Sequence, residues 1–219
     1  MRKIFASIDV GSDLIKLVVA EITHANRLNV LASAHVASLG VKKGFVVDPE
    51  AFIPKLQEVF LKCENIIGLK IDKVLCVVPG ENCEFFLSEG VSSITNDEHM
   101  IRQSDVIHAM QACTYNRISE DREIVSIKPT SYIIDDERTV TQPVGIEAVK
   151  LTVKSLVVTI PRKNVLLLVK CLEKIGVQVI DYSLSSIGDY SEFQKGMMKE
   201  TVGSIINIGY QTTTVSIFN

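Results

Sequence analysis

The sequence predicts an α/β fold into which a separate α+β unit is inserted. Two apolar runs within residues 4–21 meet at a turn, which is typical of a β-hairpin. A capped helix and a short apolar strand follow, at residues 49–65 and 73–78. Residues 83–94 are then strand-like at a point where a second helix is expected. An inserted unit is therefore predicted to begin there.

The turn of the first hairpin carries Asp9, Gly11 and Ser12, and Lys16 follows on the returning strand. Glycine can adopt backbone angles that other residues avoid, so backbone N–H groups can point into such a turn and attract an anion. Ser12 would add a hydroxyl, Lys16 a cation and Asp9 a ligand for magnesium or water. Aspartate, glycine and serine are also common in ordinary turns, and the turn taken alone favours this simpler interpretation.

The next elements complete the first half of the sheet. Residues 28–38 are small, β-branched and apolar, which predicts a third antiparallel strand. Asp48 is a good N-cap, Pro49 suits the first helical position and Glu50 places an acid in the first turn. The helix that begins there is expected to end before Gly68.

The inserted unit is predicted to contain three strands and one helix. After the strand at 83–94, a helix at 104–115 should pack through an apolar side made of Val106, Ile107, Met110 and Cys113. Residues 124–134 form a strand in which Pro129 indicates a bulge or an edge. Residues 149–160 alternate, with one face predicted to be buried (Val149, Leu151, Val153) and the other wet (Lys150, Thr152, Lys154).

The interrupted sheet then resumes. A helix is predicted at 162–175 with Gly176 as its C-terminal cap, followed by a strand at 177–182 and a weak helix at 184–199. Residues 203–218 repeat the plan of the opening hairpin, with Gly209, Tyr210 and Gln211 in the turn.

Composition excludes several classes of protein. The chain has 219 residues, 47% of them hydrophobic, which suffices for one large domain or two small ones. A net charge of -3 without a long basic run does not predict nucleic-acid binding. The sequence lacks an apolar window of roughly 20 residues for a membrane span and lacks a secretory signal core. The five cysteines and four histidines show no disulfide or zinc spacing, so free thiols in the cytosol are expected.

Several segments follow one another in a specific order. They are Asp9-Val10-Gly11-Ser12, residues 40–48 (GVKKGFVVD), 121–124 (DREI), Pro129, 132–135 (YIID), 143–146 (PVGI) and 168–176 (LVKCLEKIG). In this order and at these separations, they resemble the FtsA family of bacterial cell-division proteins. The resemblance covers nearly the whole chain but only about the N-terminal half of the family.

The resemblance implies an actin-like, RNase-H-like half with an inserted SHS2-type strand-helix-strand-strand module. The expected boundaries are residues 1–82 and 162–200 for the actin-like subdomain and 83–161 for the module. Residues 201–219 would be the first hairpin of a second lobe that is absent from these 219 residues. Chaperone ATPases, sugar kinases and the rod-shape actin homologue lack this module. The type IV pilus assembly protein PilM has it and is the alternative.

Family residues for ATP with magnesium can be carried over at two motifs. In the first, the matching residues are Asp9, Gly11, Ser12 and Lys16, with Asp9 as the metal or water contact; in the second they are Asn207, Gly209, Thr212 and Thr213. Both motifs depart from the family pattern, at Asp13, Leu14, Asn207, Tyr210, Gln211 and Thr214. Holding Tyr210 and Gln211 in a left-handed conformation would cost about 1–3 kcal/mol each, so the second loop is expected to change shape.

The implied function is that of a division scaffold. The family links the ring of the tubulin-like protein FtsZ to the membrane, recruits later division proteins through the module and self-associates. It acts in the cytoplasm at the inner face of the membrane, held by a C-terminal helix that is absent here. Weakened nucleotide binding is expected, and this chain alone is not expected to hydrolyse ATP. The alternatives are an ATPase completed by another chain and a PilM-like pilus platform.

Overall fold

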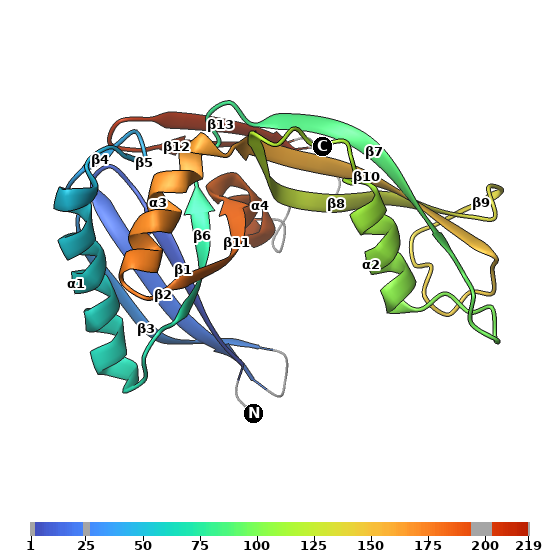
Figure 1. The fold of residues 1–219 in the computed structure, drawn as a ribbon, viewed down its shortest axis with the longest axis horizontal. Coiled ribbons are helices and arrows are strands. Elements are labelled where there is room, and N and C mark those ends of the chain that lie inside the picture. The colour runs from blue at the N-terminus through green and yellow to red at the C-terminus, as the bar shows by residue number, and fades with distance from the viewer. Residues whose placement is uncertain (1–2, 24–26, 194–202, 219) are drawn as a thin grey trace. The chain divides into compact units, whose positions relative to one another are not determined.

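The computed structural model describes residues 3–23, 27–193 and 203–218. The chain divides into two compact units, Met1–Gly80 with Lys163–Asn219, and Glu81–Arg162. Each unit has its own sheet, and the mixed α/β class predicted from the sequence is confirmed (Figure 1).

The first unit is built on a five-stranded mixed sheet in the order β11-β6-β1-β2-β3. The strands are β1 (Lys3–Val10), β2 (Leu14–Ile22), β3 (Leu28–Ala37), β6 (Lys73–Val78) and β11 (Gln178–Leu184). β1, β2 and β3 pair antiparallel, as the opening hairpin and third strand predict, whereas β6 runs parallel to both β1 and β11. Alternate side chains of β1 and β2 are buried: Ala6, Ile8 and Val10, and Ile15, Leu17 and Val19.

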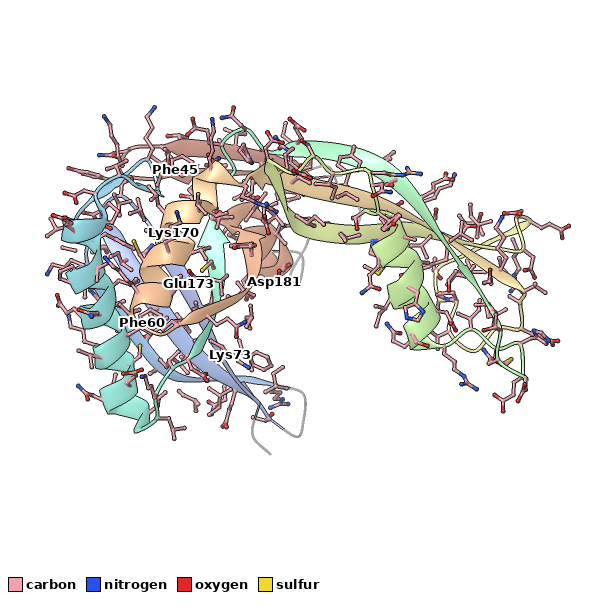
Figure 2. The ribbon with its side chains drawn as sticks, viewed as in Figure 1. Phe45, Phe60, Lys73, Lys170, Glu173 and Asp181 are labelled. Carbon is pink, nitrogen blue, oxygen red and sulfur yellow. The ribbon has the colours of Figure 1, made fainter. Side chains whose placement is uncertain are left out.

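Two helices bury apolar faces in this unit. α1 (Pro49–Ile67) begins at Asp48, whose carboxylate accepts the N–H groups of Glu50 and Ala51 at 3.0 and 3.2 Å, and it ends at Gly68 in the left-handed conformation. α1 contacts β2, β3 and α3 (Lys163–Lys174). Phe60 of α1 and Phe45 of β5 (Phe45–Val46) both lie beside α3 (Figure 2).

Short elements complete the first unit. β4 (Val41–Lys42) pairs with β5 in a short hairpin whose turn has two residues. β12 (Gly203–Ile208) and β13 (Thr213–Phe218) form a ribbon, and the ring of Phe218 stacks 4.2 Å from that of Tyr190 on α4 (Ser185–Phe193). Residues 194–199 of the helix predicted there lie outside the described residues.

The second unit is an antiparallel sheet in the order β7-β10-β8-β9, with α2 packed against β7 and β10. Its elements are β7 (Glu84–Ser93), α2 (Gln103–Ala112), β8 (Arg122–Ile134), β9 (Arg138–Val140) and β10 (Lys150–Pro161). Glu84 at the start of β7 lies opposite Thr159 near the end of β10, so the chain enters and leaves the unit at one end of its sheet.

Part of the predicted pattern within this unit is wrong. Ile107 is 46% exposed, because Val106 and Ala109 make the buried side of α2. Val149 precedes β10 and is 67% exposed, whereas Thr152 is only 6% exposed. β10 is an inner strand, and Thr152 lies between its register partners Val91 on β7 and Ile133 on β8.

The bulge expected at Pro129 is confirmed. Ser131 pairs with Lys154 and Pro129 with Ser155, which leaves Thr130 between them without a partner position on β10. The hydroxyl of Thr130 instead donates to the carbonyl of Lys154 at 3.1 Å.

Candidate functional site

The loop of the first hairpin is a tight turn closed by its own backbone. The N–H of Gly11 donates to the carbonyl of Leu14 at 3.0 Å, and a Cβ at Gly11 would lie 2.9 Å from that oxygen. Gly11 is not among the residues with positive φ. Glycine is therefore required here by close contact rather than by an unusual backbone conformation.

Asp9 and Lys16 face each other across this hairpin. They are register partners, with the Nζ of Lys16 3.5 Å from the Oδ2 of Asp9, and their side chains are 44% and 55% exposed. Asp9 alternates with the buried Ile8 and Val10, so it lies on the sheet face turned away from that apolar layer. An exposed pair of this kind is weak, so either side chain remains available to a ligand.

The loop of the second hairpin repeats the first. The N–H of Gly209 donates to the carbonyl of Thr212 at 2.8 Å, and a Cβ at Gly209 would lie 3.0 Å from that oxygen. Asn207 is the register partner of Thr214, as Asp9 is of Lys16. Neither Tyr210 nor Gln211 has a positive φ, so the loop avoids the left-handed conformation that would be costly for these residues.

A third turn, which the sequence reasoning did not include in the site, connects the two loops. The N–H of Gly44 donates to the hydroxyl of Ser12 at 3.0 Å, and the N–H of Lys43 donates to the side-chain oxygen of Gln211 at 2.8 Å. A Cβ at Gly44 would lie 2.8 Å from Pro79, which fixes this turn beside the end of β6. The Lys-Lys-Gly sequence between the short strands was the available signal.

The two predicted motifs thus meet one connecting turn, and the groups present fit a phosphate better than a metal. Ser12 keeps its hydroxyl hydrogen, and Lys16, Thr212 and Thr213 supply further donors. Asp9 is the one carboxylate among the site residues carried over from the family, since Asn207 replaces its counterpart. Within the described ranges, no cluster of three or more histidine, cysteine, aspartate or glutamate side chains suits a metal ion.

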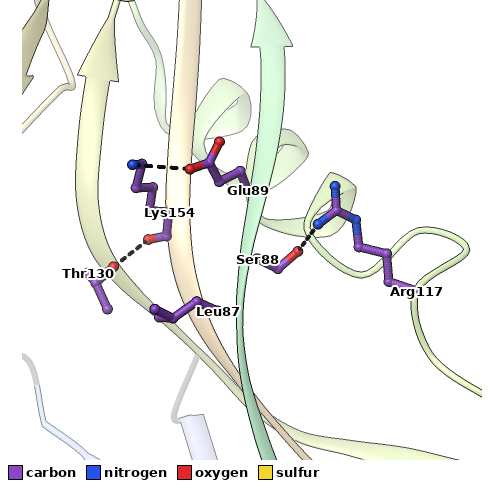
Figure 3. A pocket seen from close by; sticks show the side chains of 6 residues that line it. All are labelled: Leu87, Ser88, Glu89, Arg117, Thr130 and Lys154. Carbon is purple, nitrogen blue, oxygen red and sulfur yellow. Dashed lines mark hydrogen bonds and ion pairs between the residues drawn. The ribbon is translucent and has the colours of Figure 1, made fainter.

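The second unit has a pocket of about 370 Å³ lined by Leu87, Ser88, Glu89, Arg117, Thr130 and Lys154 (Figure 3). Its polar side chains interact with one another: Lys154 forms an ion pair with Glu89 at 3.1 Å, and Arg117 donates a hydrogen bond to Ser88 at 3.0 Å. Ser88 also donates to the carbonyl of Cys113 at 2.6 Å. The bond from Ser88 to Cys113 ties the C-terminal end of α2 to β7, and the pair of Lys154 and Glu89 joins β10 to β7.

Cysteine chemistry is disfavoured at Cys63, Cys76, Cys83 and Cys171. All five cysteines are free, and burial raises the pKa of the Cys76 thiol to about 12. Burial also raises the pKa values of Cys63, Cys83 and Cys171. These thiols remain protonated near neutral pH, where only the thiolate is a good nucleophile.

Comparison with known proteins finds similarity to cell division protein FtsA. Residues 80–159 match the family model described as the SHS2 domain inserted in FTSA. The cell division protein FtsA of Bacillus subtilis (strain 168) is 26% identical over 217 residues, which are 99% of this chain and 49% of that relative. This chain carries an SHS2 domain of the kind inserted in FtsA, and it is similar to FtsA proteins over nearly its whole length. FtsA of Streptococcus pneumoniae serotype 2 is 27% identical over 212 residues, which are 97% of this chain and 46% of the relative.

The chain spans about half the length of the curated relatives it matches. Among solved structures, it is similar to the PilM-PilN type IV pilus biogenesis complex, with a TM-score of 0.61 at 14% identity. That match covers 97% of this chain and 57% of the other chain, and it shows a shared fold. No helix in the described part of the chain is long and apolar enough to cross a membrane.

Proposed function

We propose that this chain is the module-bearing half of an FtsA-like cell-division scaffold. The observation that carries the proposal is the likeness to FtsA proteins over 97–99% of the chain, together with the SHS2 match at residues 80–159. In this role the protein acts in the cytoplasm at the inner face of the membrane. It connects the FtsZ ring to that membrane, self-associates and recruits later division proteins.

The proposed division of labour follows the expected boundaries. Residues 1–82 and 162–200 form the actin-like subdomain, 83–161 the interaction module and 201–219 the first hairpin of a second lobe. The exposed residues Ile206, Ile208, Val215 and Ile217 support the last assignment. They alternate along the ribbon on one face, as expected for a hairpin that packs against further protein.

Nucleotide binding is proposed to be weak. Gly11, Ser12, Lys16, Asn207, Gly209, Thr212 and Thr213 would bind ATP, and Asp9 would contact its magnesium or a water. Asn207 and Thr214 replace both carboxylates of the second motif, and Asp13 adds a like charge near phosphate oxygens. Calorimetric titration with Mg-ATP should show no binding in the micromolar range. Micromolar, magnesium-dependent binding to this chain alone would refute weakened binding.

A localisation experiment tests the scaffold role. A fluorescent fusion at the native locus should form a ring at the division septum, and depletion should give filamentous cells. The fold likeness to the pilus protein does not distinguish the two functions, because it shows architecture alone. Normal division with loss of pili on depletion would instead establish a PilM-like platform.

A further inference from the structure

The turn between β4 and β5 has two backbone donors that its own hairpin does not use. Lys42 pairs with Phe45, so Lys43 and Gly44 are the two central residues of the turn. Their φ values of 52° and 80° match a type I′ turn, in which both central residues have positive φ. The two consecutive N–H groups point away from the ribbon and need acceptors elsewhere.

These donors are divided between the two hairpin loops. The N–H of Gly44 donates to the first loop, at the hydroxyl oxygen of Ser12, with a distance of 3.0 Å. The N–H of Lys43 donates to the second loop, at the side-chain oxygen of Gln211, with a distance of 2.8 Å. These two residues are 168 positions apart in the sequence. Ser12 accepts through its hydroxyl oxygen and Gln211 through its side-chain amide oxygen, and both side chains keep hydrogens to donate.

We propose that Gln211 is an internal latch that occupies the Lys43 donor and holds the second loop to the turn without any ligand. An anion oxygen that used this donor would first have to displace Gln211. The inference goes beyond the proposed function, because it rests on contacts of this chain and holds whether or not ATP binds. It also explains how the loop tolerates a bulky polar residue where the family has glycine.

Amide hydrogen exchange of the ¹⁵N-labelled full chain, measured by NMR, tests the latch. In Gln211→Ala, exchange of the Lys43 amide should become roughly threefold to tenfold faster, as expected for one exposed hydrogen bond. Gly44 should keep its rate, because Ser12 is unchanged. Gln211→Glu should preserve protection of Lys43, since a carboxylate also accepts. Tyr210→Ala is the matched control on the same loop, and it should leave both amides unchanged.

Titration with inorganic phosphate adds a second readout. Phosphate should shift the Lys43 amide resonance in Gln211→Ala at concentrations that leave the parent resonance in place. Equal Lys43 exchange rates in the parent and Gln211→Ala would overturn the latch, as would equal phosphate shifts in both proteins. Neither result bears on septal localisation, so the latch and the scaffold role can fail separately.

Discussion

Gly90 is the position where one methyl group should do most damage to the inserted unit. It lies on β7 opposite Val153, directly beneath α2. A Cβ there would lie 2.0 Å from the carbonyl oxygen of Ala109 and 2.6 Å from the amide nitrogen of Cys113. Both obstacles are backbone atoms, so a change of rotamer cannot relieve the overlap.

The size of the effect follows from these distances. Ordinary contact begins near 3.4 Å, so α2 would have to move by about 1.4 Å (3.4 minus 2.0). That movement separates buried Val106 and Ala109 from the sheet and strains the hydrogen bond from Ser88 to Cys113. Overpacking and a lost buried hydrogen bond together should cost about 3–5 kcal/mol in Gly90→Ala.

Urea unfolding followed by circular dichroism measures this loss, and hydrogen–deuterium exchange of peptides assigns it to Glu81–Arg162. Gly188→Ala is the matched control, since a Cβ there meets nothing within 4 Å; it should be neutral or stabilising by up to about 1 kcal/mol. A free energy of unfolding for Gly90→Ala within about 0.5 kcal/mol of the parent would refute the close approach of α2 to β7.

Three further outcomes are expected. Denaturant titration of Asp48→Ala should show a loss of about 1 kcal/mol in the free energy of unfolding. Asp48→Asn should retain most of that stability, because asparagine still accepts the N–H groups at the start of α1. Lys43→Asn should raise the free energy of unfolding by about 0.5–1 kcal/mol, because asparagine tolerates positive φ better than lysine. The control Lys42→Asn should not raise it. The pKa of Cys76 is raised from 9.0 to about 12, so the folded chain keeps a proton that the unfolded chain has lost above pH 9. Unfolding free energy should fall by up to about 1.4 kcal/mol per pH unit above pH 9, and Cys76→Val should remove this part of the slope.

Local signals in the sequence were sufficient for most elements. Asp48 with Pro49 marks the start of α1, Gly68 and Gly176 mark two helix ends, and Pro129 marks the bulge in β8. Each signal depends on a few neighbouring residues and the conformation they allow, so it can be read without knowledge of the tertiary structure.

What the sequence did not predict depends on distant parts of the chain. Thr152 is buried on an inner strand whose neighbours β7 and β8 come from other parts of the chain, and alternation along one strand cannot reveal that. Gly11 was correctly placed in a turn, but for a reason that only the position of the Leu14 carbonyl supplies. The contact between Lys43 and Gln211 could not be predicted, because it joins residues separated by most of the chain.

The pairing of Glu84 with Thr159 has a consequence for folding order. Glu81–Arg162 separates β6 from α3 along the chain, so closing the five-stranded sheet through unfolded polypeptide would mean closing a loop of about 80 residues. Once the inserted unit has folded, its two ends are neighbours and the effective loop is only a few residues long. The difference in closure entropy is worth about 2–3 kcal/mol. Folding of the inserted unit therefore brings together the two chain segments that it separates. The parallel pairing of β6 with β11 is expected to form after the inserted unit has folded.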